Sequence, residues 1–120
     1  MKGAAGIAAL VSTPALAETP AWPSRLIKIV VPLPPGGVMD GLTRVVADRM
    51  AQRLGQSVIV ENKPGANGMI AASAVAGAEP DGYTVLSTMS SIVQNVSLHK
   101  LPSYKMSDLL PLAPLGRLPI

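Results

Sequence analysis

The sequence predicts an α/β fold built on a parallel sheet. Short apolar runs rich in β-branched residues alternate with longer segments of helical period, in the order β-α-β-α-β-(α)-β. Strands that are joined by helices pair in parallel through right-handed crossovers. Because ligands of such sheets bind beyond the carboxyl ends of the strands, the segments that follow the predicted strands are the first candidates for a site.

The first predicted strand, residues 27–31, is apolar apart from Lys28, which is typical of a strand buried on both faces. Three prolines at positions 32, 34 and 35 then exclude further ladder pairing. The pair Gly36-Gly37 follows and leads into a predicted helix. A helix N-terminus carries unpaired N–H groups and a positive dipole end, so this loop is either an anion site or a simple connector.

The predicted helix covers residues 38–54, and Gly55 stands where a left-handed cap belongs. Asp40 lies in the first turn, where a carboxylate interacts favourably with the helix dipole. Apolar side chains recur at spacings of three and four, and we expect them to form the buried face. They are Leu42, Val45, Val46, Met50 and Leu54.

The remaining elements continue the alternation. We expect residues 109–115, which include two prolines, to be extended and peripheral and to form the last β segment. The elements before them are a strand over 58–60, a turn-rich loop over 62–68, an alanine-rich helix over 69–76, a strand over 83–86, a polar loop over 87–91 and a short helix over 92–99.

The N-terminus has the pattern of a secretory leader. A basic start at Lys2 precedes an apolar run over residues 3–11, and residues 14–17 end in the small-x-small pattern of a cleavage site. We therefore predict a signal peptide over residues 1–17, rather than a buried helix, and a mature chain that starts at Glu18. No run reaches the roughly 18 apolar residues of a membrane span, so no direct membrane insertion is expected after cleavage.

Composition excludes several classes of function. The chain has no cysteine and one histidine, so we expect no disulfide, no thiol catalysis and no metal site. The net charge is +3, but the basic residues are scattered and only three aromatic residues are present, so nucleic acid is not an expected partner.

Signatures of catalysis are also missing. No Walker phosphate loop, dinucleotide fingerprint or nucleophile elbow occurs, so we expect no nucleotide cofactor and assign no catalytic residue. His99 lies next to Lys100 in a predicted surface helix, which favours a surface or packing role. Asp40 could pair with Glu61 or Asp81 as two carboxylates, but a helix-dipole role for Asp40 and a turn role for Asp81 are simpler explanations.

Three loops follow the three predicted strands, over residues 32–37, 62–68 and 87–91. Each contains glycine, serine, threonine or asparagine residues, which leave backbone N–H groups accessible or add hydroxyl and amide groups. Each loop could therefore be a connector or part of a cradle for an anion. Because all three belong to one sheet edge, a binding site is as strong an interpretation as a set of connectors.

The sequence resembles the substrate-binding proteins of tripartite tricarboxylate transporters, the Bug family. The residues that carry the resemblance occur in family order and cover nearly all of the predicted mature chain. They are residues 22–32, 34–37 with Asp40, 53–56, 60–66 with Gly68, 78–84 and 108–115.

The resemblance implies a periplasmic receptor of the type II periplasmic-binding-protein architecture, with two three-layer α/β domains joined by a hinge. A small carboxylate ligand would bind between the domains, and the receptor would deliver it to the membrane permease of the transporter. Family members hold one carboxylate with backbone N–H groups and small polar side chains of the three loops. The corresponding candidates here are Pro35, Gly36, Gly37 and Asp40 in the first loop, Ala66, Asn67 and Gly68 in the second, and Thr88 and Ser90 in the third.

The chain also departs from the family pattern. Family members are more than twice as long, so we expect residues 18–120 to form the N-terminal part of the first domain, without the second, and to bind ligand weakly. A truncated, non-functional product and a small exported enzyme remain the alternatives. Asn67 replaces a glycine, Met39 replaces a threonine, and Asn95-Val96 stands where an asparagine–proline pair is usual.

Overall fold

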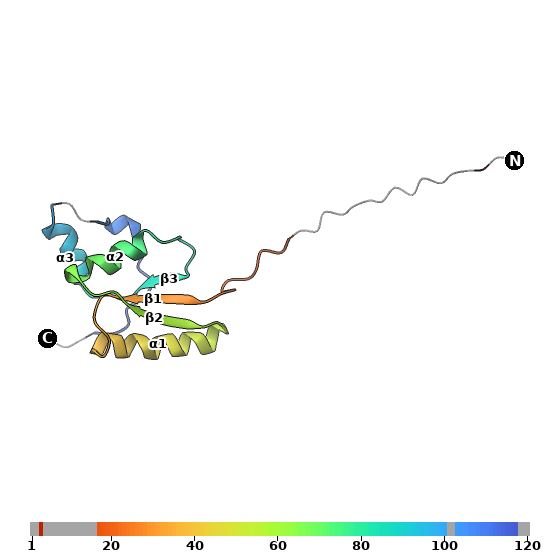
Figure 1. Ribbon diagram of the computed structural model, residues 1–120, viewed down its shortest axis with the longest axis horizontal. Coiled ribbons are helices and arrows are strands. Elements are labelled where there is room, and N and C mark those ends of the chain that lie inside the picture. The colour runs from red at the N-terminus through yellow and green to blue at the C-terminus, as the bar shows by residue number, and fades with distance from the viewer. Residues whose placement is uncertain (1–2, 4–16, 101–102, 118–120) are drawn as a thin grey trace.

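A parallel sheet of three strands forms the centre of the fold (Figure 1). The computed structural model describes residue 3 and residues 17–100 and 103–117. The strands are β1 (Ile27–Val31), β2 (Val58–Asn62) and β3 (Thr84–Leu86), in the order β2-β1-β3. The predicted α/β class and parallel pairing are therefore confirmed. The predicted signal peptide lies outside the described residues except at positions 3 and 17, and it stays a prediction.

The central strand β1 forms the core because both of its edges are paired. Ile27 lies opposite Val58 in β2, and Lys28 lies opposite Thr84 in β3. Apart from Lys28, all side chains of β1 are buried. The strand is therefore buried on both faces, as its apolar run predicts.

The helices form a layer on each side of the sheet. Helix α1 (Val38–Leu54) lies on one side, and α2 (Met69–Ala76) and α3 (Ser91–Leu98) lie on the other (Figure 1). A 3₁₀ turn, η1 (Ala66–Gly68), precedes α2, and a second one, η2 (Met106–Asp108), follows α3. The predicted bounds of α1 and α2 are confirmed. Helix α3 starts and ends one residue earlier than predicted, β2 extends to Asn62, and β3 starts one residue later than predicted.

The buried face of α1 differs from the predicted one. Its buried residues are Asp40, Thr43 and Ala47, while Leu42 is 41% and Val45 59% exposed. The prediction that Leu42 and Val45 face the core is therefore wrong. Small side chains let the helix approach the sheet closely, and the two buried polar residues have hydrogen-bond partners there.

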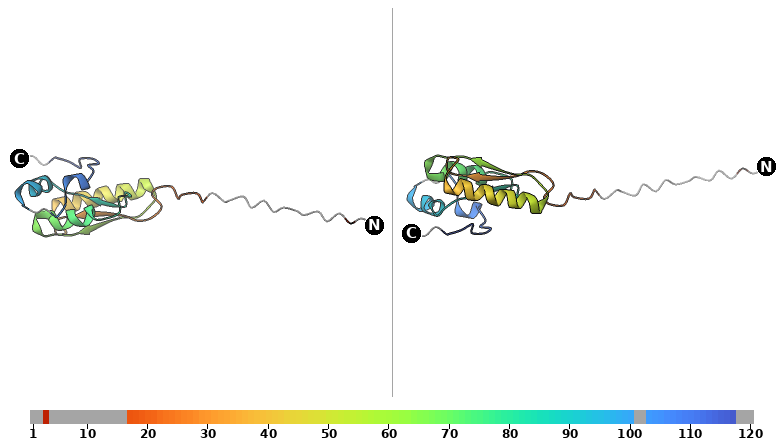
Figure 2. Two further views of the ribbon diagram at one scale, coloured as in Figure 1. Left: turned by 90° about the horizontal axis from the view of Figure 1, so that it is seen from above. Right: turned by 90° about the horizontal axis from the view of Figure 1, so that it is seen from below.

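The last predicted β segment is also wrong. Residues 109–117 contain no strand, and Leu110 and Leu112 are 84% and 74% exposed. Pro111 and Pro114 lack the N–H groups that a ladder requires. The peripheral position of this segment is as predicted, since it runs outside the layers of helices and sheet (Figure 2).

Candidate functional site

The carboxyl ends of the three strands open onto a hollow of about 360 Å³. This volume lies at the lower end of the range for small-molecule sites, roughly 300–1,000 Å³. The first loop contributes residues 32–34, and the second contributes residues 64–65 and 67–68. Residues 89–91 and Gln94, at the start of α3, complete the lining.

The lining of the hollow carries no formally charged side chain. Its polar side chains are amides and hydroxyls, contributed by Asn67, Ser90, Ser91 and Gln94. Such groups can donate hydrogen bonds to a carboxylate, and they do not repel it as an acidic side chain would. The prolines, Leu33 and Met89 add apolar walls that suit a hydrocarbon chain.

The second loop has an uncommon backbone conformation. Gly65, Ala66, Asn67 and Gly68 have φ values of 127°, 48°, 53° and 88°. For a non-glycine residue, this left-handed region costs on the order of 1–3 kcal/mol. Asparagine tolerates this region better than alanine does, so the strain lies mainly at Ala66, and it requires support from the surrounding structure.

Gly68 brings the second loop close to the first. A Cβ atom at Gly68 would lie 3.3 Å from the Cβ of Pro32. The Gly68 N–H donates to the Gly65 carbonyl at 3.0 Å, which closes the turn. The side chain of Asn67 is tied to α3: its Nδ2 donates to Asn95 Oδ1 at 2.9 Å, and Asn95 Nδ2 donates to the Asn67 carbonyl at 2.8 Å.

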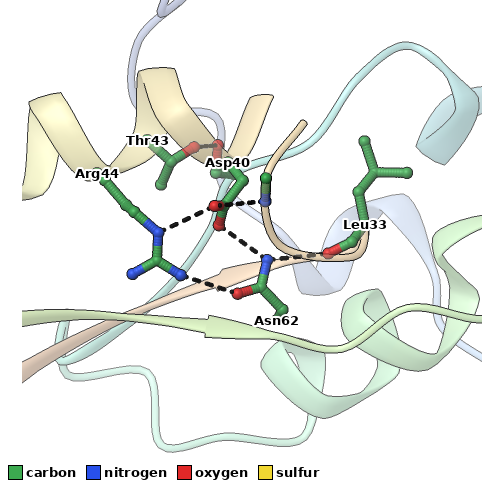
Figure 3. Close-up of polar contacts among 7 residues, drawn as sticks. Leu33, Asp40, Thr43, Arg44 and Asn62 are labelled. Atoms are coloured by element: carbon green, nitrogen blue, oxygen red, sulfur yellow. Dashed lines mark hydrogen bonds and ion pairs between the residues drawn. The ribbon is translucent and has the colours of Figure 1, made fainter. Parts of the chain in front are cut away.

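Asp40 is buried behind the first loop (Figure 3). Its Oδ2 accepts hydrogen bonds from Arg44 Nε at 2.9 Å and from the Gly36 N–H at 3.0 Å. Its Oδ1 accepts from Asn62 Nδ2 at 2.9 Å. These donors, Arg44 first, lower the pKa of Asp40 to about 2. The carboxylate of Asp40 thus occupies the position at Gly36 where the sequence suggests that an external anion could bind.

Asn62 connects the end of β2 to the first loop and to α1 (Figure 3). Its Nδ2 also donates to the Leu33 carbonyl at 2.9 Å, and its Oδ1 accepts from Arg44 Nη2 at 3.2 Å. Sequence reasoning missed this role, although Asn62 follows an apolar run at the same sheet edge as Asp40. The strand register indicates this role, because Asn62 pairs with Val31, the last residue before the first loop.

A hydrogen bond between side chains connects the third loop to α1. Thr43 and Ser87 are both buried, and their hydroxyl oxygens lie 2.8 Å apart. This bond joins the helix to the residue that directly follows β3. All three loops are therefore held by buried or half-buried polar side chains rather than by the backbone alone.

The hollow brings together only some of the predicted site residues. Asn67, Gly68 and Ser90 line it. Sequence reasoning did not assign Met89, Ser91 or Gln94 to the site. Of these, only Gln94 could have been predicted, because it lies one helical turn after Ser90. The predicted residues outside the lining are Pro35, Gly36, Gly37, Asp40, Ala66 and Thr88.

The described residues hold neither a candidate metal centre nor a membrane-spanning helix. Across residues 17–100 and 103–117, no three His, Cys, Asp or Glu side chains are grouped to bind a metal ion. Within the same ranges, every helix is too short or too polar to cross a membrane. His99 is exposed at the end of α3 and lies outside the hollow.

Comparison with known proteins places this chain in a family. Residues 42–120 match the family described as the tripartite tricarboxylate transporter family receptor. The chain is 44% identical over 119 residues to the protein BugT of Bordetella pertussis, covering 97% of this chain and 35% of BugT. It spans about a third of the length of the curated relatives that it matches.

Solved structures show the same likeness. The periplasmic binding protein BugD is 42% identical, with a TM-score of 0.67 over 70% of this chain and 28% of BugD. A protein of R. palustris, solved with adipate, is 37% identical, with a TM-score of 0.67 over 72% of this chain and 29% of that protein.

Proposed function

Because this chain belongs to the tripartite tricarboxylate transporter receptors, a family of solute-binding proteins without enzymatic activity, we propose that its hollow binds one carboxylate of a small solute. The protein captures this solute in the periplasm and delivers it to the membrane permease of a tripartite transporter. The adipate in the solved R. palustris relative supports a carboxylate as the ligand.

One observation carries the proposal: neutral donors from two loops and a helix start surround a hollow that has no acidic side chain in its lining. Asn67, Gly68 and Ser90 are the proposed contacts among the predicted residues. The other predicted residues, Pro35, Gly36, Gly37, Asp40, Ala66 and Thr88, act on the ligand through the shape of the loops. Asp40 in particular holds the Gly36 N–H, so its role is to order the first loop.

A titration of the whole chain with adipate tests the proposal. We expect the backbone amide signals of Gly68, Ser90 and Ser91 to shift in ¹H–¹⁵N spectra, because these residues line the hollow. The hollow is open and buries only part of a ligand, so we expect a Kd of about a millimolar or weaker.

The matched control ligand is 1,6-hexanediol, which has the same carbon chain as adipate but no carboxylate. It should shift these signals far less than adipate does. Equal shifts with the diol, or no shifts with adipate up to about 20 mM, would contradict a carboxylate site in this hollow.

Substitution of Gly68 separates binding from catalysis. Gly68→Ala places a methyl group 3.3 Å from Pro32 at a positive φ, so it should displace the second loop and weaken adipate binding about tenfold. His99→Ala should leave binding unchanged, because His99 lies outside the hollow. Titration with adipate measures binding in both variants. If the protein were an enzyme that uses His99, His99→Ala would abolish turnover of its substrate.

A further inference from the structure

Asn95 is a buried polar residue of α3 that does not line the hollow. Its side chain is 1% exposed, and both of its polar atoms bond to Asn67, as donor to the backbone carbonyl and as acceptor from the side-chain amide. A buried amide requires such partners, because unsatisfied polar groups in the interior are strongly unfavourable. Asn95 is therefore committed to the second loop.

The second loop needs an external support, because Ala66 and Asn67 both adopt left-handed backbone conformations. Its internal hydrogen bonds, from the Gly68 N–H to Gly65 and from the Met69 N–H to Ala66, depend on that conformation. Among the residues that the structure describes, Asn95 is the hydrogen-bond partner that another element supplies to Gly65–Gly68.

The loop and α3 both contribute to the lining of the hollow. Gly68 belongs to the loop, while Ser91 and Gln94 belong to α3. A bond between Asn67 and Asn95 fixes the distance between these two groups of donors. A ligand that contacts both would then meet donors that are already in place, which lowers the entropic cost of binding.

We propose that Asn95 is a positioning residue, which holds the second loop in its left-handed conformation and fixes it relative to the start of α3. The consequence for ligand affinity rests on the proposed function, whereas the consequence for the loop does not. Asn95 touches no ligand, and its effect is transmitted through Asn67.

Amide hydrogen exchange tests the effect on the loop. In Asn95→Ala, the Gly68 and Met69 amides should exchange about tenfold faster, since the turn loses both bonds from outside. Ser97→Ala, at an exposed position of the same helix, is the matched control and should leave both rates unchanged. Unchanged exchange in Asn95→Ala would overturn the proposal.

A glycine at position 67 distinguishes positioning from general support of the fold. Glycine adopts a left-handed conformation without strain, so Asn95→Ala should accelerate exchange much less in an Asn67→Gly background. An equal acceleration in both backgrounds would show that Asn95 acts only through helix packing. If Asn95→Ala does not fold, the same comparison is made with Asn95→Asp, which keeps the shape and loses the donation to the Asn67 carbonyl.

Adipate titration adds the functional readout. Asn95→Ala should weaken adipate binding several-fold more than Ser97→Ala does. Failure of the wild-type chain to bind adipate would overturn the proposed function. Equal affinities of Asn95→Ala and Ser97→Ala for adipate would overturn the positioning role.

Discussion

Asp40 does more than its position in the first turn of α1 suggests. A dipole interaction requires only that a carboxylate lie near the helix start. The structure adds three donors from three elements: the loop at Gly36, the helix at Arg44 and the strand end at Asn62. Asp40 is therefore a junction: its hydrogen bonds join the first loop to α1 and to the end of β2.

Replacing the charge of Asp40 tests this junction. Asp40→Asn keeps the size of the side chain but places an N–H₂ group where one oxygen accepts hydrogen bonds. We expect a lower urea midpoint and a weaker response of the Leu33 amide to adipate. Asp48→Asn, at an exposed position of the same helix, is the control. Equal midpoints in the two variants would contradict the junction.

The lowered pKa of Asp40 predicts a pH dependence of stability. Folding lowers this pKa from 3.8 to about 2, so the folded state favours the carboxylate form. The resulting stabilisation is fully present above pH 3.8 and is lost as the pH falls toward 2. The stability difference between wild type and Asp40→Asn, measured by urea unfolding, should therefore shrink between pH 6 and pH 2. A constant difference would contradict this interpretation.

At the scale of elements, the arm before β1 is held at the end of the sheet opposite the hollow. The hydroxyl of Tyr83 accepts from the Ser24 N–H at 2.8 Å, and the Arg25 guanidinium lies 3.9 Å from the centre of the Tyr83 ring. Arg25 also pairs with Asp81 at 2.7 Å, and the Trp22 ring lies 6.0 Å from the Tyr83 ring. The Ser24 hydrogen bonds lower the pKa of Tyr83. These contacts of Tyr83, which we call the Tyr83 clamp, hold the arm in place where β1 begins.

Trp22 is the single tryptophan of the chain, so its fluorescence reports on this clamp. Tyr83→Phe keeps the ring but removes the hydroxyl that binds Ser24, and it should increase quenching of Trp22 by acrylamide. Tyr104→Phe removes a hydroxyl that bonds the Ile92 carbonyl at 2.6 Å in α3 instead, and it should not change quenching. Identical quenching in the two variants would show that the arm does not depend on Tyr83.

At the scale of the whole molecule, the described surface carries more large apolar side chains than the core holds. Val38 and Val45, on the outer side of α1, are 74% and 59% exposed, and Leu98, Leu110 and Leu112 are more than 70% exposed. Exposed apolar side chains in this number favour association between molecules. The chain by itself should therefore not remain monomeric at high concentration.

Sedimentation tests this expectation. We expect the wild-type chain to self-associate at about 0.1 mM. The double variant Val38→Glu and Val45→Glu should be more monomeric, since the first charge suits the helix N-terminus and the second can pair with Arg49 one turn later. Gln52→Glu with Ser107→Glu adds the same charge at exposed polar positions and should still associate. A monomeric wild-type chain would contradict the prediction.

Features that depend on neighbouring residues could be read from the sequence. The order of the elements from β1 to α3, the bounds of α1 and α2, the buried character of β1 and the cap at Gly55 follow from β-branched runs, helical period and glycine position. The three loops of the site follow from the same order, because the ends of parallel strands meet at one edge.

Features that depend on packing could not be predicted in this way. Helical period identified an apolar stripe on α1, but the sheet covers Asp40, Thr43 and Ala47, whose small or hydrogen-bonded side chains allow a close approach. The bonds of Asn62 to the first loop and of Asn95 to the second join residues more than 25 positions apart. Local sequence specifies which elements form, whereas register and the satisfaction of buried polar groups choose the side chains that hold the loops in place.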